Sequence, residues 1–258
     1  MTAIKFKVRV KQTNALGPVN LGGGVGAPAT GAAAVPFSLT NLISYWKLDE
    51  ASGTRVDSHG TNDLTDNNTV TQSAGKLGNA AQFVAANSEY LNRADNASLS
   101  MGAGARMTIT AWVYADSLTG IDTHEIIGKR NAIDSLEYSL RTDESDLFSF
   151  FVTSDGTVGT ITLVTAEALS TATWYFVVAW YDGTNINLQV NNGTIHSTAF
   201  SADIFDGTSE FDIGAVASLL PGWSWDGRID SVGLWKRVLT ADERAALYNA
   251  GAGTEYPF

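Results

Sequence analysis

The chain has 258 residues, with 27 acidic and 16 basic side chains, a formal net charge of −11 and no cysteine. Without cysteine, disulfides, thiolate metal sites and cysteine nucleophiles are excluded, and the acidic balance argues against binding to nucleic acid, which requires clustered lysine and arginine. The sequence has no run of about 18 apolar residues, so it predicts no membrane-spanning helix.

Residues 1–41 form a basic N-terminal arm that differs from the rest of the chain. They carry four basic and no acidic side chains, whereas residues 42–258 carry 12 basic and 27 acidic ones, a net −15. Near the start, four apolar residues alternate with lysine and arginine, a period of two that predicts a β-strand. These four residues are Ile4, Phe6, Val8 and Val10. Residues 16–36 are rich in glycine, alanine, proline and threonine, which predicts a tether.

Two roles are open for the strand in residues 4–11. It is either the first strand of its own domain or a strand given to a neighbouring subunit, where backbone hydrogen bonds supply the affinity. In the second role, which we expect, the arm holds together a homo-oligomer or binds other proteins of an assembly. No continuous apolar stretch follows the charged start, so no secretory signal is expected.

From residue 42 onward, the signals of β-strands repeat at short intervals. Residues 107–114 alternate between the two faces of a strand, and residues 174–181 (WYFVVAWY) form a continuous apolar run typical of a strand buried on both faces. Asn192-Gly193 lies between two alternating runs and predicts a hairpin. This pattern predicts an all-β, two-sheet antiparallel jelly-roll sandwich. One short C-terminal helix is predicted by the capping box of Thr240 and Glu243.

Several motifs occur in the order typical of one known family. They are residues 42–50 (LISYWKLDE), 57–60 (DSHG), 75–80 (GKLGNA), 107–115 (MTITAWVYA) and 227–232 (GRIDSV). Together they resemble the laminin G-like jelly-roll domain of the concanavalin A-like lectin/glucanase superfamily, with residues 42–258 as the domain. The resemblance implies two facing antiparallel sheets, often with a structural calcium and sometimes with a glycan site. It implies no single activity, because this fold carries lectins, enzymes, adhesion modules and virion proteins.

The catalytic motifs that enzymes of related folds carry are absent from the sequence. Glycosidases of the superfamily carry a Glu-x-Asp-x-Glu pattern, which does not occur here. The three histidines are far apart, and neither a nucleophile elbow nor a Walker loop is present. We therefore expect a protein that is not an enzyme.

Calcium is the predicted cofactor, as a structural ion. Asp230 shares one face of its strand with Val232 and Leu234, so it faces inward, and a buried carboxylate must be paired, hydrogen-bonded or metal-bound. Asp49 and Asp57 occupy the positions that the family resemblance places nearby. Two alternatives remain open: these three carboxylates bind calcium, or Asp230 accepts hydrogen bonds from loop amides while Asp57 caps a turn.

The predicted carbohydrate-binding residues are Trp223, Trp225 and Asp226, in a loop that contains Pro221 and Gly222. Two tryptophans in such a loop offer flat apolar surfaces to sugar rings, and Asp226 offers oxygens to sugar hydroxyls. The alternative is that Trp225 begins the closing strand and packs inside, because tryptophan is usually highly buried.

These features together favour a non-catalytic structural protein of a bacteriophage virion: a capsid decoration, a head fibre or a tail component. Its lectin-like jelly roll would bind a cell-surface glycan, and its arm would anchor it in the virion. The alternative function is a carbohydrate-binding or adhesion module of a bacterial surface protein. Neither function involves nucleic acid or membrane as a partner.

Overall fold

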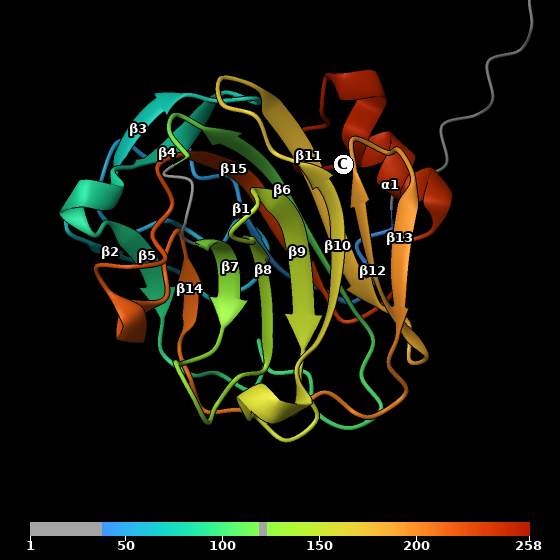
Figure 1. Cartoon of the computed structure of the whole chain (residues 1–258). Coiled ribbons are helices and arrows are strands. Elements are labelled where there is room, and N and C mark those ends of the chain that lie inside the picture. The colour runs from blue at the N-terminus through green and yellow to red at the C-terminus, as the bar shows by residue number, and fades with distance from the viewer. Residues whose placement is uncertain (1–37, 119–122) are drawn as a thin grey trace, which may run out of the picture. The chain divides into compact units, whose positions relative to one another are not determined.

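The computed structural model describes residues 38–118 and 123–258, and Figure 1 shows them as a sandwich of two antiparallel sheets. One sheet has eight strands in the order β13-β12-β11-β6-β15-β4-β3, with β1 also paired to β15. Its strands are β1 (Leu42–Trp46), β3 (Thr71–Ala74), β4 (Asn79–Phe83), β6 (Met107–Ala115), β11 (Trp174–Tyr181), β12 (Asn185–Val190), β13 (Ile195–Ala199) and β15 (Gly227–Trp235).

The second sheet has seven strands in the order β10-β9-β8-β7-β14-β5-β2. Its strands are β2 (Thr65–Asn67), β5 (Tyr90–Arg93), β7 (His124–Lys129), β8 (Tyr138–Thr142), β9 (Leu147–Val152), β10 (Thr162–Ala168) and β14 (Phe211–Ile213). The short 3-10 helices are η1 (Ala85–Asn87), η2 (Val158–Thr160), η3 (Ala217–Leu219) and η4 (Asn249–Gly251). The predicted all-β sandwich is confirmed.

The core fills the space between the two sheets. Because successive side chains of a strand point to opposite faces, every second residue of the central strands is buried there. On β9, Phe148, Phe150 and Val152 point into this core, and Phe151 and Ser149 therefore point to the outer face of the seven-stranded sheet.

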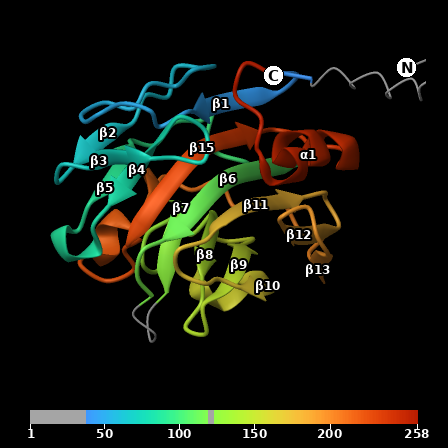
Figure 2. The same cartoon turned by 90° about the horizontal axis from the view of Figure 1, so that it is seen from above.

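The helix α1 (Ala241–Tyr248) covers the outer face of the eight-stranded sheet, as Figure 2 shows. Leu247 packs there with Phe176 and Trp180 of β11. This contact explains why β11 is apolar on both faces, as its sequence predicted. The predicted capping box is also present: the amide of Glu243 donates to Thr240 Oγ1 at 3.2 Å, and the amide of Thr240 donates to Glu243 Oε2 at 2.9 Å.

Within residues 38–118 and 123–258, no such helix covers the outer face of the seven-stranded sheet, and loops lie around its strand ends (Figures 1 and 2). In the part of the chain that the structure describes, no helix has the length and the apolar character needed to cross a membrane. The outer face of the seven-stranded sheet is therefore the place where polar side chains of several strands and loops lie together.

Candidate functional site

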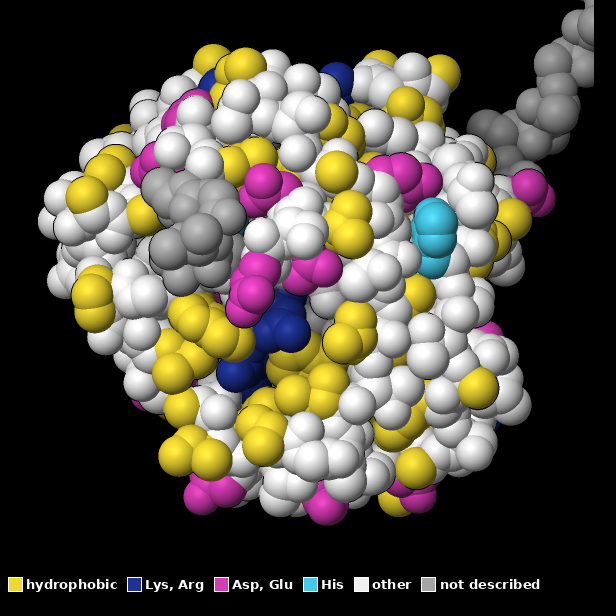
Figure 3. Space-filling view, in the orientation of Figure 1, with side chains coloured by type: hydrophobic (Ala, Val, Ile, Leu, Met, Phe, Trp, Pro, Cys, Tyr) yellow, Lys and Arg dark blue, Asp and Glu magenta, His cyan; other side chains and the backbone are white. Residues whose placement is uncertain are grey.

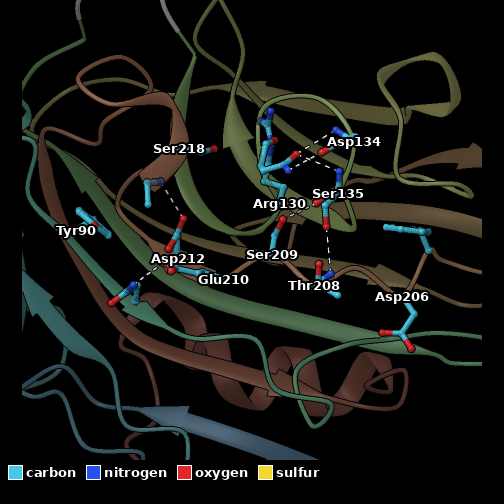
Figure 4. Close-up of a pocket in the computed structure, with 14 residues that line it drawn as sticks. Tyr90, Arg130, Asp134, Ser135, Asp206, Thr208, Ser209, Glu210, Asp212 and Ser218 are labelled. Carbon is cyan, nitrogen blue, oxygen red and sulfur yellow. Dashed lines mark hydrogen bonds between the residues drawn. The ribbon is translucent and has the colours of Figure 1, made fainter.

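A pocket of about 670 Å³ opens on the outer face of the seven-stranded sheet, beside β14, β5 and the end of β7. Its walls carry carboxylates, amides, hydroxyls, one guanidinium and two aromatic rings, as Figure 4 shows for most of them. The polar side chains are those of Asn92, Arg130, Asn131, Asp134, Ser135, Asp206, Thr208, Ser209, Glu210, Asp212 and Ser218, and the rings are those of Tyr90 and Phe205.

A buried ion pair holds one wall of the pocket in place. Lys129 Nζ lies 3.2 Å from Glu137 Oε2, and both side chains are fully buried beneath the sheet. Lys129 donates to the carbonyl oxygen of Gly207 at 2.5 Å, and the amide of Gly207 donates to Glu137 Oε2 at 3.2 Å. Both backbone groups of Gly207 are thereby fixed, so the flanking residues Asp206 and Thr208 are held in the wall of the pocket.

The loop between β7 and β8 is tied to the same wall. The amide of Thr208 donates to Ser135 Oγ at 3.1 Å, and Ser209 Oγ donates to the carbonyl oxygen of Ser135 at 2.9 Å. Asn131 Nδ2 donates to Asp134 Oδ1 at 2.8 Å, while Asn131 Oδ1 accepts the amides that follow it. Figure 4 shows these interactions on one side of the pocket. The pocket is therefore formed before any ligand binds.

Asp212 of β14 is the most buried acid in the pocket, with 3% of its surface exposed. Its Oδ2 accepts the amide of Ala217 at 2.9 Å, whereas its Oδ1 has no hydrogen-bond partner in the described parts of the chain. Burial, assisted by the negative charges of Glu210 and Glu125, raises the pKa of Asp212 to about 7. Near neutral pH, this carboxyl group can therefore either donate or accept a hydrogen bond.

Burial and the nearby carboxylates of Asp212 and Glu210 also raise the pKa of Tyr90. Its phenol remains a hydrogen-bond donor at neutral pH, in front of two carboxyl groups. Glu210 Oε2 accepts a hydrogen bond from Asn92 Nδ2 at 2.6 Å, which joins β5 to the segment before β14. This side of the pocket therefore offers both hydrogen-bond donors, from Tyr90 and Asn92, and acceptors, from Asp212 and Glu210.

Arg130 connects the pocket to a stack of rings and guanidinium groups on the neighbouring strands. The guanidinium carbon of Arg130 lies 4.7 Å from the ring centroid of Trp223 and 5.3 Å from that of Phe151. That of Arg141 lies 5.3 Å and 4.9 Å from the same two centroids. The two arginines therefore share both rings. On this face, Figure 3 shows basic side chains in a hollow flanked by hydrophobic surface.

Glu125 is the buried carboxylate of this stack. Its Oε1 accepts a hydrogen bond from Ser139 Oγ at 2.6 Å, and its Oε2 lies 3.7 Å from Arg130 Nη1, which is too long for a hydrogen bond. Burial raises the pKa of Glu125, and the positive charge of Arg130 opposes this. A Cβ on Gly128 would lie 2.3 Å from Glu125 Oε1, so only glycine leaves room for the carboxylate.

The predicted carbohydrate-binding residues are divided between the surface and the core. Trp223 lies over the arginines on the outer face, partly exposed. Trp225 is 1% exposed and packs between the sheets, so the structure does not support a sugar platform at that residue. Asp226 is partly buried, and its Oδ1 accepts the amide of Ala85 at 3.2 Å.

The three predicted calcium ligands accept hydrogen bonds from backbone amides. Asp230 Oδ2 accepts the amides of Lys76 at 2.7 Å and Leu77 at 2.8 Å. Asp57 Oδ1 accepts the amides of Tyr45, His59 and Gly60, and Asp49 Oδ1 accepts the amide of Asn79.

These contacts correspond to the alternative in which the carboxylates stabilise loops. Among the residues that the structure describes, no three His, Cys, Asp or Glu side chains are grouped as metal ligands. Calcium also needs six to eight oxygen ligands, whereas amide donors already occupy oxygens of Asp49, Asp57 and Asp230. The described geometry therefore does not fit a calcium ion held by these three residues, and the predicted cofactor gains no support.

The predicted assembly residues Ile4, Phe6, Val8 and Val10 lie outside the described residues, so their role remains a prediction. No sequence motif predicted a functional role for Arg130, Arg141, Phe151 and Asp212. A signal was present in part: Arg141 and Phe151 alternate with the core residues of their strands and must therefore face outward.

A family model for the concanavalin A-like lectin/glucanases superfamily, of the laminin G type, matches residues 85–243. The chain belongs to this superfamily. The resemblance inferred from the sequence is thereby confirmed at the level of the superfamily. No curated protein matches the chain by sequence.

Among solved structures, the binding domain of Paraclostridial Mosquitocidal Protein 1 is similar, with a TM-score of 0.66 at 14% identity, over 82% of this chain and 52% of that one. The binding domain of botulinum neurotoxin serotype G has a TM-score of 0.63 at 15% identity, over 82% and 51%. This superfamily member therefore spans about half the length of the two toxin domains.

Domain 4 of AbnA, an extracellular arabinanase of family GH43 from Geobacillus stearothermophilus, has a TM-score of 0.56 at 17% identity. The match covers 83% of this chain and 98% of that domain, whose structure contains arabinotriose. At these identities the similarity establishes the fold of the chain. Neither the bacteriophage origin nor the virion role predicted from the sequence gains support from these similarities.

Proposed function

We propose that this protein is a non-catalytic carbohydrate-binding module, used for binding or adhesion to glycans. The pocket on the outer face of the seven-stranded sheet is the observation that carries the proposal. Its volume of about 670 Å³ lies within the range of small-ligand sites. Sugars present many hydroxyl groups and apolar ring faces, and this pocket offers hydrogen-bonding side chains together with the rings of Tyr90 and Phe205.

The rigidity of the pocket also supports binding. The fixed backbone of Gly207 and the contacts of Ser135 hold the wall in one arrangement. A ligand that meets a preformed site loses less free energy to ordering the protein. The arabinotriose complex of the similar arabinanase domain shows that this fold can carry an oligosaccharide. The absence of a Glu-x-Asp-x-Glu pattern from the sequence favours binding over hydrolysis.

A glycan array, followed by calorimetric titration of the oligosaccharides that bind, tests the proposal. Tyr90→Ala should lower the affinity at least about fivefold, because truncating an important contact residue costs about 1 kcal/mol or more. Tyr114→Ala is the matched control, since Tyr114 is also a partly buried strand tyrosine but lies on the eight-stranded sheet. Absence of binding to any glycan, or equal loss in both variants, would refute the proposed function.

A further inference from the structure

Arg141 of β8 is a cation on the outer face of the seven-stranded sheet whose side chain forms no hydrogen bond with the described residues. Within the part of the chain that the structure describes, no group accepts a hydrogen bond from its guanidinium or lies close enough for an ion pair. Its Nε is buried, while the side chain as a whole is partly exposed. The negative charges of Glu125 and Asp143 attract Arg141 by long-range electrostatics and raise its pKa.

Three neighbouring buried atoms also have no hydrogen-bond partner among the residues that the structure describes. They are Arg130 Nη1, Glu125 Oε2 and Ser149 Oγ. Arg141 lies opposite both Glu125 and Ser149 in the register of the sheet, so all three side chains share the outer face. Buried polar groups are normally hydrogen-bonded, and a cluster of exceptions on one face needs an explanation.

The cluster also carries more positive than negative charge. Arg130 and Arg141 contribute two positive charges, and Glu125 is the buried carboxylate between them. Burial lowers the pKa of both arginines, and the charge of Arg130 lowers that of Arg141 further. An additional negative group at this position would relieve the repulsion between the two guanidinium groups.

We propose that this cluster, which adjoins the pocket at Arg130, makes the protein selective for glycans that carry a carboxylate, with Arg141 and Arg130 binding the carboxylate group. This inference rests on the proposed function and names the class of glycan. A guanidinium group is a planar fork of donors that matches the two oxygens of a carboxylate. The rings of Trp223 and Phe151 hold both forks, so little side-chain entropy is lost when the ligand binds.

The pocket beside the cluster determines the orientation of such a ligand. The acids Asp134, Asp206 and Glu210 line the pocket, whereas Arg141 lies outside its lining, and these acids can accept hydrogen bonds from sugar hydroxyls. They would repel a carboxylate, which places the anionic group of the sugar at the arginines. A neutral sugar would leave the guanidinium of Arg141 without a partner.

The test is a titration of matched pairs of oligosaccharides. The panel contains oligogalacturonides, oligosaccharides with terminal glucuronate and sialylated oligosaccharides, each with its methyl ester, which keeps the sugar but removes the charge. At least one acid should bind about tenfold or more tightly than its ester, because a hydrogen bond to a charged group contributes about 1.5–3 kcal/mol. This preference should weaken as salt is added.

The variant Arg141→Gln should strongly reduce the preference for the acid over the ester, because only Arg130 then remains to bind the carboxylate. Arg106→Gln is the matched control, because Arg106 also stacks on a ring, that of Tyr181 at 5.6 Å, but lies at the other sheet. Circular dichroism and melting curves of both variants show whether they remain folded. If Arg141→Gln does not fold, Arg141→Lys, which keeps the charge but loses the fork, should reduce the preference.

The outcomes separate this inference from the proposed function. If acids and esters bind equally, or if Arg141→Gln keeps the preference, the selectivity is refuted while the carbohydrate-binding function stands. Sulfated oligosaccharides are titrated beside the panel, and a preference for one of them over every carboxylated member would also refute the selectivity. If no member of the panel and no neutral glycan binds, both proposals fail.

Discussion

Asp230 provides the sharpest test of how this sandwich uses its buried carboxylates. The side chain is 0% exposed, and its oxygens accept three hydrogen bonds, from the amides of Lys76 and Leu77 and from Ser231 Oγ. The informative comparison is Asp230→Asn against Asp230→Ala. Asparagine has the same size, and its carbonyl oxygen can still accept the two amides, while its NH2 group can donate to the hydroxyl of Ser231.

The two variants should differ by several kcal/mol in the free energy of unfolding. Alanine leaves two amides without an acceptor at about 1–3 kcal/mol each, so Asp230→Ala should destabilise the protein by about 2–6 kcal/mol. Asparagine avoids this loss and also removes the burial of a charge. At pH 8, Asp230→Asn should therefore be more stable than the wild-type protein.

The pH dependence of this gain follows from the pKa of Asp230, which burial raises from 3.8 to about 7. A raised carboxyl pKa means that the native state binds the proton more tightly than the unfolded state. The stabilisation that the native state gains by binding this proton is therefore fully present below about pH 4, and it is lost as the pH rises to about 7. A shift of this size corresponds to about 4 kcal/mol, which is the greatest gain expected for Asp230→Asn at pH 8.

Urea denaturation of the three proteins at pH 4 to 8, with and without a calcium chelator, measures these effects. Asp212 and Glu137 also have pKa values raised to about 7, so Asp230→Asn should remove only part of the pH dependence. If Asp230→Asn destabilises the protein as much as Asp230→Ala, the argument from amide acceptors is wrong. If a chelator destabilises only the wild-type protein, that result would instead support a calcium ion bound at Asp230.

Three further predictions concern other parts of the chain. Trp223→Ala should weaken glycan binding, measured by calorimetry, while the protein stays folded, because the ring of Trp223 covers the two arginines from outside. If the variant unfolds, Trp223 is needed for stability and the prediction is wrong. Glu243→Ala should cost about 2–4 kcal/mol in urea denaturation, since it leaves Arg237 and the amide of Thr240 without their carboxylate; a change below about 1 kcal/mol would contradict this. Deletion of residues 1–36 should leave a folded protein that light scattering shows to be a monomer. If the shortened protein still forms an oligomer, the arm is not what holds the subunits together.

Local patterns in the sequence determined most of the secondary structure. The hairpin predicted at Asn192-Gly193 joins β12 to β13, although the residues with positive φ are Asn191 and Asn192, one position earlier. Both residues are asparagines, which tolerate this conformation, so the sequence pattern identifies the hairpin but not the exact position of the turn. The capping box of α1 was equally visible, because its two partners are three residues apart.

Alternation along a strand also determined which way a side chain points, but not what it meets. Asp230 was predicted to face inward, and it does. Its amide partners, however, lie more than 150 residues earlier in the chain. Only the pairing of β15 with β4 brings the loop before β4 to this carboxylate. A choice between amides and calcium therefore required the tertiary structure.

The candidate site shows the same limit more strongly. Tyr90, Arg130, Arg141 and Asp212 come from four strands or strand ends, and no local spacing links them. Their proximity follows from the strand order β8-β7-β14-β5, in which β14 lies between strands that precede it in the chain by more than 80 residues. The sequence determined that these side chains face outward from a sandwich, because alternation is a local property. The tertiary structure alone decided that they come together in one pocket and the arginine cluster beside it, because strand order depends on contacts across the whole chain.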